Sequence, residues 1–192
     1  VPVRFGATTY RFSLVTTKLP GTDLLVYLVV CPALYGREAT YTADADEHLR
    51  FALLSRAAIE SCQRMGFAPD VFHVHDWHTA LVPLYLKTVY AWDRLFAATK
   101  TVLTIHNIGY QGVVAAAAKD ELGFGEYASF LHQDDLARGR LSFLTSGILY
   151  ATTLSTVSRT HAREMMTAEY GMGLDGMLRA RADSFVGIVN GI

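Results

Sequence analysis

One short stretch, Pro69-Asp70-Val71-Phe72-His73-Val74-His75-Asp76-Trp77-His78, constrains the fold of this chain more than any other. It begins with a Pro-Asp turn, continues through strand-forming residues and ends in a dense polar cluster. A short apolar run bounded by turn signals is typical of a buried parallel strand. In open α/β sheets, ligands bind beyond the carboxyl ends of such strands. The His, Asp and Trp side chains that close the stretch therefore stand where a binding site is expected.

Strand-like and helix-like segments alternate along the rest of the chain. Strands are expected at 71–75, 101–106, 153–157 and 185–189. Helices are expected at 46–65 (with Asp46 as cap and Gly66 as stop), 79–90, 141–150, 158–169 (with Ser158 as cap) and 174–181. This alternation predicts an α/β fold with a Rossmann-like parallel sheet. The segments 3–17 and 24–31 predict an antiparallel pair near the start. Residues 32–45 are expected to form a loop, and 107–139 a long functional loop with short helical pieces.

Composition excludes several classes of protein. The chain has 192 residues, of which 51% are hydrophobic and 18% charged, so it is long and apolar enough for a globular domain with a real core. With 17 basic and 18 acidic residues and no basic block, it does not resemble a nucleic-acid binder. Its apolar runs, such as 24–34, are too short to cross a membrane. Cys31 and Cys62 lie in apolar segments, so we expect no disulfide and a reducing compartment.

Three of the expected strands end in polar residues, at His75-Asp76, His106-Asn107 and Asn190-Gly191. In a parallel sheet all three ends lie on the same edge. A single strand that ends in His is usually structural. Three such ends carrying Asp, His and Asn favour a ligand crevice.

The polar cluster at 73–78 allows three interpretations. A metal site is disfavoured, because dinuclear zinc hydrolases use the spacing His-x-His-x-Asp-His, whereas here Asp76 follows His75 directly. A structural interpretation makes Asp76 the N-cap of the next helix and makes His73 and Trp77 packing residues. The third interpretation is a sugar-binding crevice, in which Asp, His and Asn bond hydroxyl groups and an aromatic ring supplies an apolar face.

Six ordered motifs identify a family. They are His-Val-His-Asp-Trp-His at 73–78, Thr-Ile-His-Asn-Ile-Gly-Tyr-Gln-Gly at 104–112, Gly-Arg-Leu-Ser-Phe-Leu at 139–144, Thr-Val-Ser-Arg-Thr-His-Ala-Arg-Glu at 156–164, Tyr-Gly-Met-Gly-Leu-Asp-Gly at 170–176 and Val-Asn-Gly-Ile at 189–192. With these motifs the chain resembles bacterial glycogen synthases and plant starch synthases over nearly its whole length.

The resemblance implies a retaining hexosyltransferase that moves glucose from ADP-glucose to the non-reducing end of an α-1,4-glucan. Enzymes of this family use no metal or other cofactor, and two Rossmann-like domains face a cleft in a B-type glycosyltransferase fold. The resemblance places this chain in the N-terminal, acceptor-side half. It also implies a bacterial cytoplasm or a plant plastid as the compartment.

Carried over by position, the resemblance makes Asp76 and His106 the catalytic residues. Asp76 is expected near the reacting sugar, where it helps to order the cleft. His106 is expected to contact the donor glucose near its 6-hydroxyl, and Asn190 to reach the same sugar. The remaining predicted substrate-binding residues are Tyr41, His75, Trp77, Asn107 and Gly191.

Two parts of the family pattern are absent from the sequence. The family opens with a strand and a Lys-x-Gly-Gly-Leu loop that meets the donor phosphates, and it carries an Arg/Lys pair and a Glu in a C-terminal donor-binding domain. Residues 1–192 are therefore expected to be an N-terminal catalytic domain without its first strand and phosphate loop, inactive alone and dependent on the missing domain. The alternative is a non-catalytic glucan-binding or interaction module from a truncated reading frame.

Overall fold

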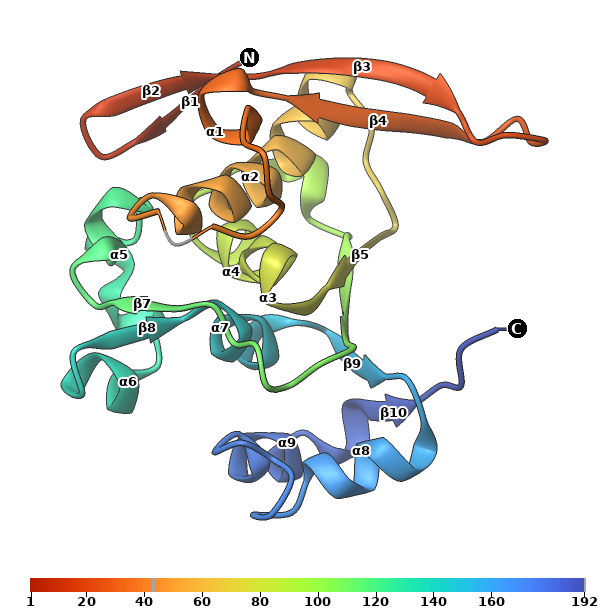
Figure 1. Ribbon diagram of the computed structural model, residues 1–192, viewed down its shortest axis with the longest axis vertical. Coiled ribbons are helices and arrows are strands. Elements are labelled where there is room, and N and C mark those ends of the chain that lie inside the picture. The colour runs from red at the N-terminus through yellow and green to blue at the C-terminus, as the bar shows by residue number, and fades with distance from the viewer. Residues whose placement is uncertain (43, 192) are drawn as a thin grey trace.

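A computed structural model describes residues 1–42 and 44–191 (Figure 1). Two β-hairpins precede an alternation of helices and strands. The strands are β1 (Pro2–Phe5), β2 (Thr8–Arg11), β3 (Ser13–Lys18), β4 (Leu25–Val30), β5 (Val71–His75), β6 (Lys100–Ile105), β7 (Val113–Ala115), β8 (Arg140–Ser142), β9 (Thr153–Thr156) and β10 (Phe185–Gly187). The α-helices are α1 (Pro32–Tyr35), α2 (Glu47–Met65), α3 (Asp76–Thr79), α4 (Leu81–Lys87), α5 (Ala118–Glu121), α6 (Gln133–Ala137), α7 (Phe143–Tyr150), α8 (Arg159–Met165) and α9 (Asp175–Ala180). Short 3₁₀ turns are η1 (Arg94–Phe96), η2 (Gly125–Phe130) and η3 (Ala182–Ser184).

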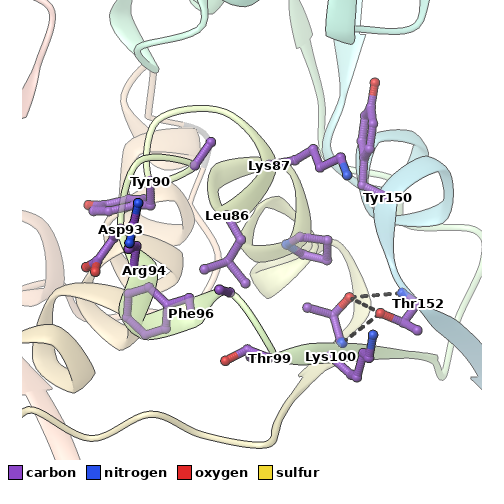
Figure 2. A pocket seen from close by; sticks show the side chains of 14 residues that line it. Leu86, Lys87, Tyr90, Asp93, Arg94, Phe96, Thr99, Lys100, Tyr150 and Thr152 are labelled. Carbon is purple, nitrogen blue, oxygen red and sulfur yellow. Dashed lines mark hydrogen bonds between the residues drawn. The ribbon is translucent and has the colours of Figure 1, made fainter.

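A parallel sheet with the strand order β10-β9-β6-β5 forms the centre of the fold. His75 pairs with Thr104, and Ile105 pairs with Thr156, so the carboxyl ends of the strands lie together at one edge. This confirms the predicted Rossmann-like parallel sheet. At the opposite edge, where β6 begins, the chain encloses a separate pocket (Figure 2).

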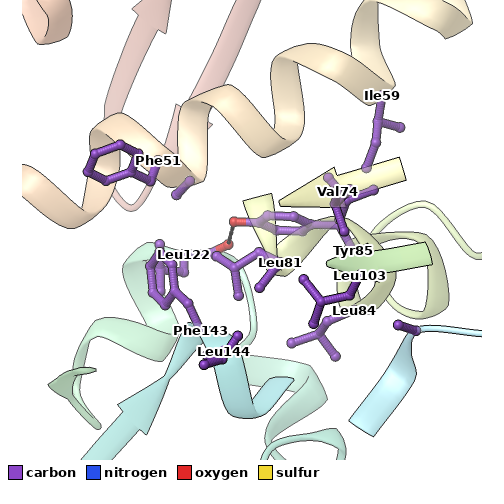
Figure 3. Close-up of a cluster of buried hydrophobic side chains, with 14 of the residues drawn as sticks. Phe51, Ile59, Val74, Leu81, Leu84, Tyr85, Leu103, Leu122, Phe143 and Leu144 are labelled. Atoms are coloured by element: carbon purple, nitrogen blue, oxygen red, sulfur yellow. Dashed lines mark hydrogen bonds between the residues drawn. The ribbon is translucent and has the colours of Figure 1, made fainter. Parts of the chain in front are cut away.

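The core lies where the helices pack against the sheet. Val74, Leu103 and Leu154 are almost completely buried in their strands, because helices cover a parallel sheet and leave its residues little contact with water. The side chains of α4 and α7 meet those of β5 and β6 in one cluster (Figure 3). Within it, the buried Tyr85 keeps its hydroxyl bonded by donating to the carbonyl of Leu122 at 3.1 Å.

Helix α2 has the predicted boundaries, but the predicted capping role of Asp46 is wrong. It ends at Gly66, whose φ of +62° is in the left-handed region and whose N–H donates to the carbonyls of Cys62 and Gln63. Asp46 holds the N-cap position, but its side chain does not cap. Its two carboxylate oxygens instead accept from Arg37, each at 2.7 Å.

The N-terminal segment contains the predicted antiparallel pair, as β3–β4, and one further pair that was not predicted. It forms two separate two-stranded sheets, β1–β2 and β3–β4. The chain reverses between β1 and β2 at Gly6, which has a φ of +55° and donates its N–H to the carbonyl of Glu121 at 2.9 Å. A glycine adopts this conformation without the strain that a side chain would add.

Other predicted boundaries move by a few residues. Helix formation begins at Asp76 and ends at Lys87, so the predicted helix 79–90 starts too late and ends too late. Ser158 does cap α8, since its hydroxyl accepts from the N–H of His161, but α8 ends at Met165. The short helical pieces expected within 107–139 are present as α5, η2 and α6. The antiparallel pair β7–β8 and the short helix α1 within 32–45 were not predicted. Cys31 and Cys62 are free thiols, as expected. In the described part of the chain, no helix is both long and apolar enough to span a membrane.

Candidate functional site

A cavity of about 470 Å³ lies at the carboxyl ends of β5 and β6. Residues from three places in the sequence line it, namely Tyr41, Asp76, Trp77, His78, Asn107 and Tyr110. The loop before α2 supplies the first, the β5–α3 junction supplies the next three, and the segment after β6 supplies the last two. The cavity therefore stands where ligands bind in open α/β sheets.

Asp76 joins the ends of the two strands. Its Oδ1 atom accepts hydrogen bonds from the backbone N–H of His106 at 2.8 Å and of Asn107 at 3.2 Å. Asp76 also has a φ of +50°, a left-handed conformation that costs a non-glycine residue roughly 1–2 kcal/mol. Two hydrogen bonds to a charged acceptor offset that cost. Its carboxylate therefore does not cap the following helix, which corrects the structural interpretation of the sequence.

Two histidines form a direct pair beside the cavity. The Nδ1 atom of His75 lies 3.0 Å from the Nε2 atom of His106. One of these nitrogens must donate and the other accept, so at least one of the two rings is neutral. Burial lowers the pKa of His75, and the charges of His73 and His106 lower it further. His73 is held separately, with its Nε2 atom 2.7 Å from the hydroxyl of Thr104.

Trp77 forms one wall of the cavity. Its ring packs edge-on against Phe51, with 4.4 Å between the ring centroids, and lies over Gly112. A Cβ atom added at Gly112 would lie 2.8 Å from the Trp77 Cδ2 atom, and Gly112 has a φ of +59°. Glycine is thus required at this position for both space and backbone conformation. Part of the indole surface stays open to the cavity.

Tyr41 lines the cavity and contacts the polar cluster. Its hydroxyl lies 2.9 Å from the Nε2 atom of His78. The buried Arg50 holds the same loop by donating to the carbonyl of Thr40 at 2.8 Å. Burial lowers the pKa of His78, although the charge of Asp76 opposes this shift. A neutral His78 can either donate to the Tyr41 hydroxyl or accept from it.

The cavity continues into a second hollow of about 400 Å³ along the β7 strand. Tyr41, Trp77 and Tyr110 line both hollows, and Glu47, His48 and Val113 are among the residues that line the extension. Tyr110 is 68% exposed and Tyr41 is 59% exposed. Large exposed aromatic rings beside carboxylates and imidazoles suit a ligand that has apolar faces and many hydroxyl groups.

The structure brings together most of the predicted site residues. Tyr41, Asp76, Trp77 and Asn107 line the cavity, and the His75–His106 pair stands next to it. Asn190 and Gly191 follow β10 on the same edge, but β9 lies between β10 and β6. Because neighbouring strands are about 4.8 Å apart, the end of β10 is about 10 Å from that of β6. The two residues do not line the cavity, and their roles stay predictions.

Two residues of the cavity were not in the predicted set. His78 lies two positions after Asp76, so the first helical turn carries it to the same opening. Tyr110 lies between Gly109 and Gly112, and an aromatic residue in a glycine-rich loop is a signal that could have identified it. In the described residues, no group of three His, Cys, Asp or Glu side chains is arranged to hold a metal ion.

Comparisons with known proteins agree on one family. The family model described as starch synthase catalytic domain matches residues 1–180. The chain is 46% identical over 180 residues to glycogen synthase 1 of Geobacter sulfurreducens, which covers 91% of this chain and 36% of that protein. It is 38% identical over 194 residues to a glycogen synthase of Thermosipho africanus, which covers 100% of this chain and 39% of that protein.

A solved structure shows the same fold. The catalytic domain of starch synthase IV from Arabidopsis thaliana, bound to ADP and acarbose, superposes with a TM-score of 0.88 at 30% sequence identity. The match covers 100% of this chain and 39% of that one. The chain thus spans well under half the length of the proteins that it matches.

Proposed function

The chain belongs to the starch synthase catalytic-domain family, and from this premise we propose that it forms the acceptor-side part of a retaining glucosyltransferase that extends an α-1,4-glucan. The donor in this proposal is ADP-glucose, and no metal or other cofactor takes part. The remaining donor-binding groups come from a further domain. Relatives named glycogen synthase and a neighbour bound to ADP and acarbose support this proposal.

The observation that carries the proposal is the composition of the cavity at the carboxyl ends of β5 and β6. Its lining combines the aromatic rings of Trp77 and Tyr110 with the polar groups of Asp76, His78 and Asn107. A glucose ring has an apolar face and a rim of hydroxyl groups, so it fits such a lining. The extension along β7 gives room for further sugar units of a glucan chain.

The proposed mechanism gives each polar residue one task. Asp76 fixes the backbone of His106 and Asn107, and its negative charge stabilises the positive charge that develops at the anomeric carbon of the donor glucose. His75 orients the imidazole of His106 through the bond between their ring nitrogens. His106 then presents its other ring nitrogen to a hydroxyl group of the donor sugar. This division makes Asp76 and His106 catalytic residues and His75 a positioning residue.

A chimera tests the proposal. Residues 1–191 replace the matching segment of the Geobacter sulfurreducens glycogen synthase, and incorporation of labelled glucose from ADP-glucose into glycogen is measured. We expect activity in the chimera, and a loss of about two to three orders of magnitude in kcat for Asp76→Asn and for His106→Ala. Both variants should still unfold in a single cooperative transition.

The matched control is Arg163→Gln, which removes an exposed charge on α8 and should leave kcat unchanged. A folded chimera with no incorporation at all would contradict the proposed function. Near-complete activity in Asp76→Asn or in His106→Ala would show that the substituted residue is not catalytic. Elemental analysis that finds about one zinc or manganese ion per active chimera, lost together with activity on chelation, would contradict the metal-free mechanism.

A further inference from the structure

A pocket of about 540 Å³ lies at the amino ends of the parallel strands, away from the candidate site. Its lining comes from α4, from the segment that contains η1, from the start of β6 and from the segment between α7 and β9. β6 runs from Lys100 at this pocket to Ile105 at the candidate site. At about 3.3 Å per residue, the two ends of this strand are roughly 17 Å apart, so the pocket is a separate place on the molecule.

Three cationic side chains surround the pocket, Lys87, Arg94 and Lys100. Figure 2 shows Arg94 at one side, next to Tyr90 and Asp93, and Lys87 and Lys100 at the other side, towards Tyr150 and Thr152. Within residues 1–42 and 44–191, none of the three side chains has a hydrogen bond or an ion pair with a protein acceptor. Most other arginines and lysines of this chain have such a partner, for example Arg37 with Asp46 and Arg179 with Asp175.

The other polar groups of this pocket already bond within the protein. The carboxylate of Asp93 accepts from Gln63 and from the backbone N–H of Leu95. The Tyr90 hydroxyl donates to Glu60, and the Tyr150 hydroxyl donates to the carbonyl of Phe130. Thr101 and Thr152 bond to each other's backbone N–H. The donors left over for a ligand are therefore the two ammonium groups and the guanidinium group.

Two apolar side chains, Leu86 and Phe96, also line the pocket. Phe96 is 7% exposed, and Leu86 lies between the two groups of cations in Figure 2. Asp93 is the one acidic side chain among the described lining residues, so the formal charge of the lining is positive. Cationic side chains on both sides of the apolar Leu86 suit a ligand that has an anionic head and a small organic body.

We propose that this pocket binds a small organic phosphate of about monosaccharide size. Lys87 and Lys100 hold the phosphate group at one side of the pocket, and the body of the ligand covers Leu86 and extends towards Arg94. A phosphomonoester carries close to two negative charges at neutral pH, which match the two ammonium groups. The site is independent of the proposed glucosyl transfer.

Calorimetric titration of the chain tests this site with three probes, glucose 6-phosphate, inorganic phosphate and glucose. We expect saturable binding of glucose 6-phosphate at low ionic strength, several-fold weaker binding of inorganic phosphate and none of glucose. The double variant Lys87→Gln/Lys100→Gln should raise the Kd for glucose 6-phosphate at least tenfold, because it removes two charge-assisted hydrogen bonds to the phosphate group. The control Arg159→Gln/Arg163→Gln removes two charges from α8 and should leave the Kd unchanged.

Four results would overturn the proposal. The first is no saturable binding of glucose 6-phosphate. The second is an equal loss of affinity in the α8 control, which would indicate a general charge effect. The third is a Kd that responds to His106→Ala and not to the double variant, which would assign the phosphate to the other edge of the sheet. The fourth is equal affinity for inorganic phosphate and glucose 6-phosphate, which would mean that the pocket binds the free anion and does not contact the sugar.

Discussion

The β3–β4 hairpin and the sheet edge at the candidate site contain similar strand residues but bury them differently. Leu25 and Leu28 in β4 are both 49% exposed, whereas Leu103 and Ile105 in β6 are both 0% exposed. β6 has β5 on one side and β9 on the other, and helices pack over it. β4 pairs with β3 alone in the described structure, and Figure 1 shows the two strands as a ribbon that extends beyond α2.

This difference shows that an apolar strand sequence predicts a strand but does not predict its burial. The hairpin forms because its backbone groups pair in register from Ser13–Val30 to Lys18–Leu25. A two-stranded ribbon gains little from side-chain burial, and it is only marginally stable by itself. The site edge gains its stability from contacts that are far apart in sequence, and the same contacts fix the geometry of Asp76 and His106.

The largest expected effect comes from truncating one leucine in each region. Leu103→Ala removes a fully buried side chain and should lower the free energy of unfolding by about 2–5 kcal/mol. Leu28→Ala removes a side chain that is half exposed, and it should cost less than about 1 kcal/mol. Urea unfolding followed by circular dichroism measures both. Equal losses of unfolding free energy would mean that Leu28 is packed in solution and that the two regions do not differ in burial.

Two glycine-to-alanine substitutions, one in each region, should have an intermediate effect on the free energy of unfolding. Gly112→Ala adds a Cβ atom next to Trp77 in a backbone conformation with a φ of +59°, so strain and overpacking should together cost about 2–4 kcal/mol. Gly21→Ala in the β3–β4 turn meets no atom within 4 Å and has a φ of +76°, so the conformational strain alone should cost about 1 kcal/mol. The same urea experiment compares the two variants. Equal effects at the two positions would show that the Trp77 ring moves aside and that only the conformational strain remains.

The smallest expected effect is a pH dependence confined to the site edge. The pKa values of His75 and His78 are lowered in the folded protein, mainly by burial. Below about pH 6.5, the usual pKa of a histidine, the unfolded chain binds protons that the folded site does not, so folding stability is complete above this pH and decreases as the pH falls through it. The hairpin contains no histidine and should not respond.

Hydrogen exchange of the β5, β6, β3 and β4 amides between pH 7.5 and 5.5, corrected for intrinsic rates, measures this difference. We expect protection to decrease at β5 and β6, and less so in the double variant His75→Gln/His78→Gln. A parallel decrease in β3 and β4 would indicate global acid destabilisation unrelated to these two histidines.

Much of the local structure was predictable because it depends on neighbouring residues. Strand β5 was predicted at its observed bounds, and the stop of α2 at Gly66 follows from the freedom of glycine to adopt a left-handed conformation. The placement of Asp76 and His106 at the same sheet edge followed from the parallel alternation of strands and helices. The two hairpins were predicted as one, because a turn at Gly6 interrupts an alternating pattern that reads as a single strand.

The sequence by itself thus determined the strands of the parallel sheet, the main helices, the family and the edge of the sheet that carries the site. Only the tertiary structure decided how the site residues meet. The bonds from Asp76 to two backbone N–H groups, the ring contact of His75 with His106 and the seating of Trp77 on Gly112 all join separate segments. The strand order is likewise a result of tertiary structure, and it places the end of β10, before Asn190, two strands away from the end of β6, before His106. The hydrophobic periodicity of a sequence indicates which residues share one face of a helix or strand. The distance between residues on different elements depends on packing across the whole domain.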